Sequence, residues 1–513
     1  MQSWARLLSR RRRKLDEVTK GEGLGDAYTG TLSRIQAQPG SRSKLGMKVL
    51  MWVSHAERPL HIDELCHALG AEGSTDLDIG NIPAIETLLA SSLGLVVVEK
   101  SSSTVRLVHY TLQEYLSNNT NLFLNPHSII SEACLTYLNF PHVRSFSPTL
   151  RSVPPTAPFV EYASCYWGTH ARSETTESVK TLALKLLDGY DKHISSKVLL
   201  LNGVRAAEQP FDGDGAPTGF TGLHGAAYFG CLELAVALLE TNKGDVQATD
   251  FHGNRAIAWA SRRGNEGVLR ALLEWSEAYS GAPTVSEYGS APLLWAAENG
   301  HEGVVRILLE KKNINPDKPD RRGRTPLSWA SRSGHEGVVR MLLERDDVNP
   351  NKPDFLGKTP LVQASGHGHE GVVRMLLERN DVNPKKMAIF RTSPLWWASY
   401  NGQERVVRIL LERNDVNPDK SDLFRRTPLW LASVNGHEGV VRMLLERNDV
   451  NPNKQNFLGI TPLAQASYKG HEGVVRMLLE RSDVNPDQQG LLGTTPLSWA
   501  ANMGHTGVVR TLL

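Results

Sequence analysis

The chain has 513 residues, with 57 Lys or Arg against 55 Asp or Glu, so its formal net charge at pH 7 is only +2. This balance argues against a protein that works by neutralising a polyanion. Four cysteines without regular spacing are typical of a reduced, intracellular protein. The most apolar run, 88–98, is too short to span a bilayer, and no signal-peptide pattern opens the chain. We therefore expect a cytoplasmic protein that does not bind membranes.

Residues 1–44 are predicted to form a basic N-terminal segment with little apolar periodicity. Its one sharp feature is the run from Arg10 to Lys14. Such runs occur in nuclear-import signals and nucleic-acid patches, and also on solvated turns near chain ends. The run adds a nuclear, DNA-associated regulator as an alternative to a cytoplasmic protein.

Residues 45–120 are predicted to form a winged-helix-like domain. Apolar periodicity predicts helices at 47–55, 63–69 and 81–93, followed by a hairpin of β-rich runs at 95–99 and 104–110. Three helices followed by a hairpin is the element order of a winged helix. Residues 46–116 hold four cations and nine anions, and four minus nine is −5. DNA binding by this domain is not expected, because phosphate neutralisation supplies most nonspecific DNA affinity.

Further helices are predicted at 111–116, 128–140, 159–171 and 174–187, and residues 121–210 are assigned to a helical linker segment. Several phrases of this N-terminal third resemble the segment that follows the nucleotide-binding module in fungal NOD-like (NACHT-type, STAND) receptors. These phrases are Arg58–Leu65, Val108–Leu116, Cys134–Leu138 and Tyr162–Trp167.

In that receptor family the winged helix relays the state of the nucleotide-binding module to a C-terminal repeat array. The sequence contains no Gly-x-x-x-x-Gly-Lys-Ser/Thr phosphate loop. The resemblance therefore implies that the chain corresponds to the C-terminal half of such a receptor. It also implies a nucleotide-binding receptor module as one candidate partner.

The C-terminal part, 211–513, repeats with a fixed period. A proline between a small residue and a leucine stands at Pro292, Pro326 and every 34 residues (326−292) up to Pro496. Weaker copies begin at 221 and 255, which gives nine units starting at 221, 255, 291, 325, 359, 393, 427, 461 and 495. A period of this length indicates stacked supersecondary units, none of which can bury its apolar faces alone.

Each unit is predicted to form two helices and an extended turn. Thr325 and Pro326 fit the N-cap and first position of one helix, and Gly334 ends it. The second helix carries an apolar stripe of valines and leucines and stops at Asn349-Pro350. The predicted fold is therefore mainly α, a solenoid of nine 34-residue helix-turn-helix repeats behind a winged-helix and helical segment.

The Thr-Pro-Leu-x-x-Ala core, the Gly-His-x-x-Val-Val helix start and the Asp-Val-Asn close resemble the ankyrin family. The period is one residue longer than the usual length of about 33. The histidine that usually follows Thr-Pro-Leu is replaced, for example by Ser328 and Trp396. In the family that histidine bonds neighbouring repeats together, so we expect that particular support to be missing.

No group of residues in the sequence has the spacing of a catalytic or metal-binding motif. The recurring pair His335-Glu336 would need a second histidine four positions after the first to bind zinc, and Val339 stands there. No nucleophile elbow and no paired Cys/His signature occurs. The sequence therefore predicts a non-catalytic protein with no metal and no cofactor.

The positions that vary between otherwise similar repeats lie at the turn tips, on the first helices and beside the closing glycine. The ankyrin resemblance implies that these positions line a concave groove where protein partners bind, and aromatic and arginine side chains dominate such contacts. The predicted partner-binding residues are Trp329, Phe355, Phe390, Trp396, Trp397, Tyr400, Phe424, Arg425, Trp430, Phe457, Tyr468 and Trp499. The predicted function is protein–protein recognition by a scaffold. The alternative is the sensor part of a NACHT-type NTPase without its nucleotide-binding module.

Overall fold

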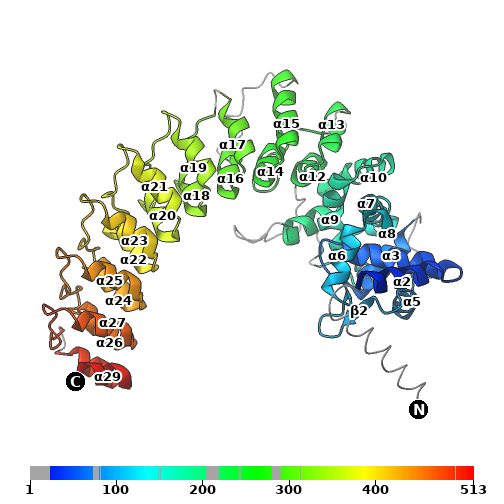
Figure 1. Cartoon of the computed structure of the whole chain (residues 1–513). Coiled ribbons are helices and arrows are strands. Elements are labelled where there is room, and N and C mark those ends of the chain that lie inside the picture. Colours follow the sequence, from blue (N-terminus) through cyan, green and yellow to red (C-terminus); the bar gives the residue numbers. More distant parts are fainter. Residues whose placement is uncertain are drawn as a thin grey trace, which may run out of the picture. The chain divides into compact units, whose positions relative to one another are not determined.

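The computed structural model describes residues 24–513 except 73–79, 81, 148–149, 151, 204–218, 242–243, 280–290, 312–313 and 491–492. The chain divides into two compact units, Met1–Ile257 and Ala258–Leu513. The architecture is mainly helical, as predicted, with a small sheet in the first unit and stacked helix pairs in the second (Figure 1). The basic run Arg10–Lys14 lies outside the described residues. The boundaries proposed after residues 44, 120 and 210 stay predictions.

The first unit begins with a winged helix. Its elements are α2 (Leu24–Gln36), α3 (Ser41–His55), β1 (Leu60–His61), α4 (Ile62–Ala71), α5 (Ile85–Ser91), β2 (Val96–Glu99), β3 (Thr104–Leu107) and α6 (Tyr110–Asn118). The antiparallel sheet has the order β1-β3-β2, so the predicted three helices and hairpin are confirmed.

Two elements of this domain were missing from the sequence prediction. Strand β1 has two residues, which is too short for an alternating pattern. Helix α2 lies in the segment predicted to have little periodicity, although its buried residues Tyr28, Leu32 and Ile35 have helical spacing.

The predicted helical segment follows. Its elements are η2 (Thr120–Leu122), α7 (Pro126–Leu138), α8 (Pro141–Arg144), α9 (Val160–Ser173), α10 (Glu177–Leu187), η3 (Tyr190–Lys192), α11 (Ile194–Val198) and η4 (Leu199–Gly203). The helix predicted from residue 174 begins three positions later, because the Thr176 side chain caps it by accepting a hydrogen bond from the Val179 N–H.

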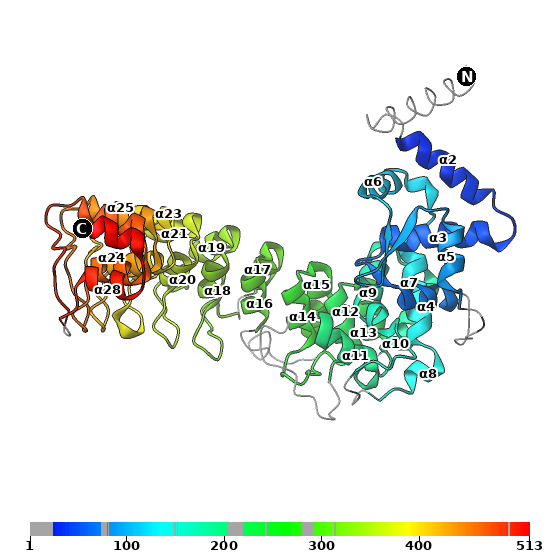
Figure 2. The same ribbon diagram turned by 90° about the horizontal axis from the view of Figure 1, so that it is seen from below.

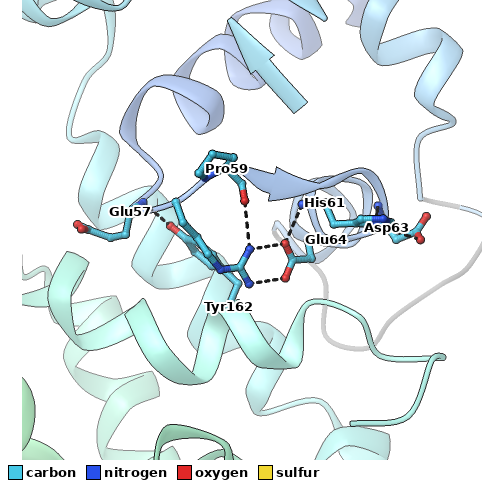
Figure 3. A network of polar contacts seen from close by, with 7 residues as sticks. Glu57, Pro59, His61, Asp63, Glu64 and Tyr162 are labelled. Atoms are coloured by element: carbon cyan, nitrogen blue, oxygen red, sulfur yellow. Dashed lines mark hydrogen bonds and ion pairs between the residues drawn. The ribbon is translucent and has the colours of Figure 1, made fainter. Parts of the chain in front are cut away.

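An ion pair within the winged helix packs against Tyr162 of α9. Nη1 and Nη2 of Arg58 each donate to the buried Glu64 carboxylate at 2.7 Å, and the His61 N–H donates to it at 2.8 Å (Figure 3). The guanidinium lies 5.3 Å from the centre of the Tyr162 ring, whose hydroxyl accepts from the Glu57 N–H at 3.1 Å. A two-pronged pair of this kind is strong and geometrically specific. These bonds give Arg58, His61 and Glu64 of the segment Arg58–Leu65 a structural role.

Tyr162 also forms a hydrogen bond with the buried His170. Its hydroxyl donates to Nε2 of His170 at 2.9 Å, and Nδ1 of His170 lies 2.8 Å from Nδ1 of His127. Burial, assisted by the neighbouring His127 and His55, lowers the pKa of His170 to about 3. The folded unit therefore keeps this ring neutral in mildly acidic solution.

We expect His170 to make the chain sensitive to acid. Its folded pKa lies below the ordinary value of about 6.5, so the unfolded chain takes up the proton first as pH falls. The contribution of His170 to the free energy of unfolding is fully present above about pH 6.5. It is lost progressively as the pH falls toward about 3, with a slope of up to about 1.4 kcal/mol per pH unit. Urea unfolding between about pH 7 and about pH 4 should show a shallower decline for His170→Gln than for wild type. The exposed His109→Gln serves as control, and equal slopes for wild type and His170→Gln would contradict the assignment.

The nine predicted repeats are all present as helix pairs. They are α12 (Gly222–Phe229) with α13 (Leu232–Glu240), α14 (Ala256–Arg263) with α15 (Glu266–Tyr279), α16 (Ala291–Asn299) with α17 (Glu302–Leu309), α18 (Pro326–Ser333) with α19 (Glu336–Leu343), α20 (Pro360–His367) with α21 (Glu370–Glu378), α22 (Pro394–Tyr400) with α23 (Glu404–Leu411), α24 (Pro428–Asn435) with α25 (Glu438–Leu445), α26 (Pro462–Lys469) with α27 (Glu472–Leu479), and α28 (Pro496–Asn502) with α29 (Thr506–Leu512). A short helix, η5 (Ile389–Arg391), precedes α22. Within the second unit first helices pack on first helices and second helices on second helices (Figure 1).

The helix termini follow the predicted chemistry. Oγ1 of Thr325 accepts the Ser328 N–H at 3.1 Å, Pro326 occupies the first turn, and Gly334 closes the helix with a φ of 81°. The buried residues Val338, Val339 and Leu342 form the predicted apolar stripe of the second helix. The local pattern therefore places every repeat in the same geometry.

A histidine still bonds adjacent repeats, but it is the one after the closing glycine. Nε2 of His335 donates to the Glu298 carbonyl in the preceding repeat at 2.8 Å. The same bond recurs at His369, His437, His471 and His505. The His335 ring lies so close to Gly300 that a methyl group there would come within 2.6 Å of Nδ1, and Gly300 also has a φ of 75°. Two glycine requirements and one hydrogen bond therefore fix the contact between these repeats.

We expect His437→Ala to destabilise the array by about 1 kcal/mol or more, because it removes the bond to the Tyr400 carbonyl and the packing of the ring. The urea midpoint is the suitable measure, since a solenoid need not unfold in one step. The control is His367→Ala, whose ring contacts the Gln363 carbonyl of its own helix. Equal midpoints for the two variants would contradict the bridging role of His437.

Candidate partner-binding surface

Backbone hydrogen bonds join the turn tips of the second unit into a ladder. The Phe355 N–H donates to the Arg322 carbonyl at 2.9 Å. Three equivalent bonds follow along the array, Ile389 to Leu356, Leu423 to Phe390 and Phe457 to Phe424, between 2.7 and 3.0 Å. The loops that carry these tips extend together to one side of the helix layers (Figure 2). The tips therefore form a continuous surface rather than separate loops.

A buried acidic side chain at the base of the turn fixes its shape. Oδ1 of Asp422 accepts the N–H groups of Phe424 and Arg426 at 2.9 and 2.8 Å. Its Oδ2 accepts from Arg426 Nε at 2.8 Å and from Trp396 Nε1 at 3.2 Å. The same two backbone bonds are accepted by Asp320, Asp354 and Asn456. The side-chain oxygen atoms of these residues are therefore occupied by hydrogen bonds within the array.

The predicted phenylalanines are exposed on this surface. Phe355 is 76% exposed, Phe390 51%, Phe424 41% and Phe457 54%. The ring centres of Phe390 and Phe424 are 6.1 Å apart, and those of Phe424 and Phe457 are 5.8 Å apart. Leu356, Ile389, Leu423 and Leu458 are exposed beside them. We call the exposed turn residues 321–322, 355–356, 389–391, 423–425 and 457–458 the tip strip.

Three predicted tryptophans lie beneath this surface. Trp329, Trp396 and Trp430 are only 8%, 6% and 8% exposed. Their indole N–H groups donate to Asp320, to Asp422 and to the Ile460 carbonyl, each at 3.2 Å. Because each indole N–H binds a residue of a turn, these side chains support the tips from below.

The remaining predicted residues are exposed or half-buried. Tyr400 stacks on Trp396 with ring centres 5.5 Å apart, and Tyr468 meets Trp499 edge-on at 5.1 Å. Trp397 is half-buried, with the Lys358 ammonium 3.7 Å from its ring centre. They form an aromatic edge on the first helices.

The predicted partner-binding residue Arg425 is exposed. The single-residue prediction omitted Arg391 and the aliphatic members of the tip strip, which occupy equivalent turn positions. These positions vary between repeats in the same way, but the prediction favoured aromatic hot-spot residues and therefore left them out.

No group of three or more His, Cys, Asp or Glu side chains among the described residues is placed to hold a metal ion. Burial raises the pKa of the thiols of Cys66, Cys165 and Cys231, to about 11, 12 and 12. These thiols are therefore poor nucleophiles near neutral pH. Among the described helices, none is both long and apolar enough to cross a membrane.

The comparison with protein families agrees with this geometry. A family model described as "Ankyrin repeats (3 copies)" matches residues 223–320, 280–354, 315–388, 361–456 and 448–513. These matches cover more than half of the chain, which belongs to the ankyrin-repeat family. Proteins of this family are generally non-catalytic and bind other proteins, which makes the chain a protein-interaction scaffold in this broad sense.

The N-terminal part carries a second match. The model described as "GPI inositol-deacylase, winged helix domain" matches residues 35–125, a winged helix of the NACHT-associated type. The solved human ASB11 ankyrin repeat domain is 25% identical to this chain. The match covers 43% of this chain and 97% of that domain, with a TM-score of 0.39. The comparison with curated proteins found no match.

We expect Asp422→Ala to lower the free energy of unfolding by about 2 kcal/mol or more, because it leaves several N–H donors of the turn without their acceptor. Asp422→Asn should cost less, since Asn456 keeps both backbone bonds in the next repeat. Urea unfolding followed by tryptophan emission reports stability and the environment of Trp396 together. Equal losses for the two variants would contradict the proposed role of the Asp422 side chain.

Proposed function

We propose that the chain is a non-catalytic recognition protein that binds another protein along the tip strip. The observation that carries this proposal is the row Phe355, Phe390, Phe424 and Phe457, exposed at two adjacent turn positions of four successive repeats. Contiguous apolar surface rimmed by polar residues is characteristic of protein-interaction sites. The backbone ladder holds the tips in place, so little conformational entropy is lost when a partner binds.

The predicted residues take different roles in this proposal. The four phenylalanines and Arg425 contact the partner, with Tyr400 as their neighbour on the first helices. Trp397, Tyr468 and Trp499 extend the contact along the aromatic edge. Trp329, Trp396 and Trp430 shape the tips from beneath, so replacing them would disturb the array itself.

The test compares wild type with Phe355→Ser, Phe390→Ser, Phe424→Ser and Phe457→Ser combined in the full chain. A partner captured by the wild type and then purified should bind this variant at least about tenfold more weakly, because its apolar anchors are lost. The matched control replaces the exposed Arg374, Arg408 and Arg442 of the second helices by alanine. Unchanged affinity of the serine variant, with circular dichroism unchanged, would contradict the proposal.

The winged helix supports a second candidate. We propose as the alternative that the chain is the regulatory part of a NACHT-type NTPase and acts together with a nucleotide-binding module. The supporting observation is the match of residues 35–125 to a winged helix of that type. Under this alternative, binding of the chain to a purified module should differ between ATP and ADP. Equal binding with both nucleotides would argue against it.

A further inference from the structure

Two arginines of the tip strip occupy a backbone position that other repeats give to glycine. Arg391 and Arg425 have φ values of 62° and 59°. The equivalent turn positions hold Gly323, Gly357 and Gly459, with φ values of 80°, 71° and 72°. A side chain is disfavoured in this left-handed region, where glycine is not. Strained residues of this kind concentrate at functional sites.

The same two arginines lack a charge partner among the residues that the structure describes. Both are exposed, and neither forms an ion pair with any residue that the structure describes. Arg426, by contrast, is engaged by Asp422 at 2.7 Å. The strain at Arg391 and Arg425 is therefore not offset by an internal salt bridge.

The carboxylates of the tips all point away from this surface. Asp320, Asp354 and Asp422 accept the backbone bonds of their turns, and Asp419 pairs with Lys454 at 2.8 Å. The tip strip itself contains Arg321, Arg322, Arg391 and Arg425 and no acidic residue. It therefore presents only positive charge between its exposed apolar side chains.

We propose that Arg391 and Arg425 bind carboxylates of an extended, acidic and apolar segment of the partner protein. This inference rests on the proposed function and names the chemistry of the partner. Successive repeats stack about 10 Å apart. An extended segment in the polyproline II conformation has three residues per turn and a rise of about 3.1 Å per residue, so every third side chain returns to the same face after about 9 Å. A glutamate at every third position can then meet an arginine on each of two adjacent tips, while leucines between them contact Phe390 and Phe424. Arginine suits this role because its planar fork binds a carboxylate through two hydrogen bonds.

A single-stranded nucleic acid fits this surface less well. Bases stack on aromatic faces, whereas Phe390 and Phe424 already contact each other with centres 6.1 Å apart and leave no gap for a base. Much of the remaining surface is aliphatic, from Leu356 to Leu458. The apolar content and the isolated arginines favour a peptide.

The experiment measures fluorescence anisotropy of a labelled peptide of about twelve residues that repeats Glu-Leu-Ser, mixed with the full chain. It should bind at least about tenfold more tightly than the same peptide with Gln for Glu, and its binding should weaken between about 0.05 and about 0.5 M salt. The double variant Arg391→Gly and Arg425→Gly should lose at least about tenfold in affinity. Its unfolding midpoint should rise by about 2 °C or more per site, because glycine suits the left-handed position.

Matched controls separate this inference from general charge and from the proposed function. Arg408→Gln with Arg442→Gln removes the same charge from the second helices and should leave peptide binding unchanged. Equal affinity of the Glu and Gln peptides, absence of Glu-peptide binding, full binding by the glycine variant, or tighter binding of a labelled oligothymidine would each overturn the inference. The phenylalanine experiment with the captured partner decides the proposed function by itself, so the two can fail separately.

Discussion

The structure depends on one constraint: no repeat can bury its two apolar helix faces without its neighbours. The valines and leucines of each second helix, such as Val338 and Leu342, are buried because the adjacent repeat covers them. The bond from His335 to the Glu298 carbonyl and the close approach to Gly300 fix how adjacent repeats meet. Stability therefore comes from a series of equivalent interfaces rather than from one core.

That constraint also decides where the chain can vary. The buried valines, the alanine of the first helix, the closing glycine and the histidine after it are all used by the interface between repeats. The turn tips are held only by their backbone ladder and by a side chain such as Asp422 at their base. Apart from the left-handed positions of Arg391 and Arg425, their outward side chains are not used by the contacts between repeats, and there the chain presents phenylalanine and leucine. The separation of supporting and displayed residues is what a recognition surface requires.

Much of the fold could be predicted from the sequence because the same local pattern recurs in nine repeats. The caps at Thr325 and Gly334 and the stripe at Val338 and Val339 are local signals that the structure confirms. Strand β1 escaped prediction because two residues carry no pattern and the strand depends on its pairing with β3. The exposure of the candidate site was harder to foresee. Trp396 and Phe424 are both variable aromatic residues, but the indole reaches Asp422 of the next tip while the phenyl ring has no such bond.

The central claim is that the tip strip, and not the outer face of the second helices, contacts the partner. Hydroxyl-radical footprinting of the full chain, with and without its purified partner, tests this claim most directly because it reads individual side chains. The account predicts that oxidation of Phe355, Phe390, Phe424 and Phe457 falls several-fold in the complex, while oxidation of the buried Trp396 stays low in both states. Unchanged oxidation of the four phenylalanines, with protection on the second helices instead, would contradict it.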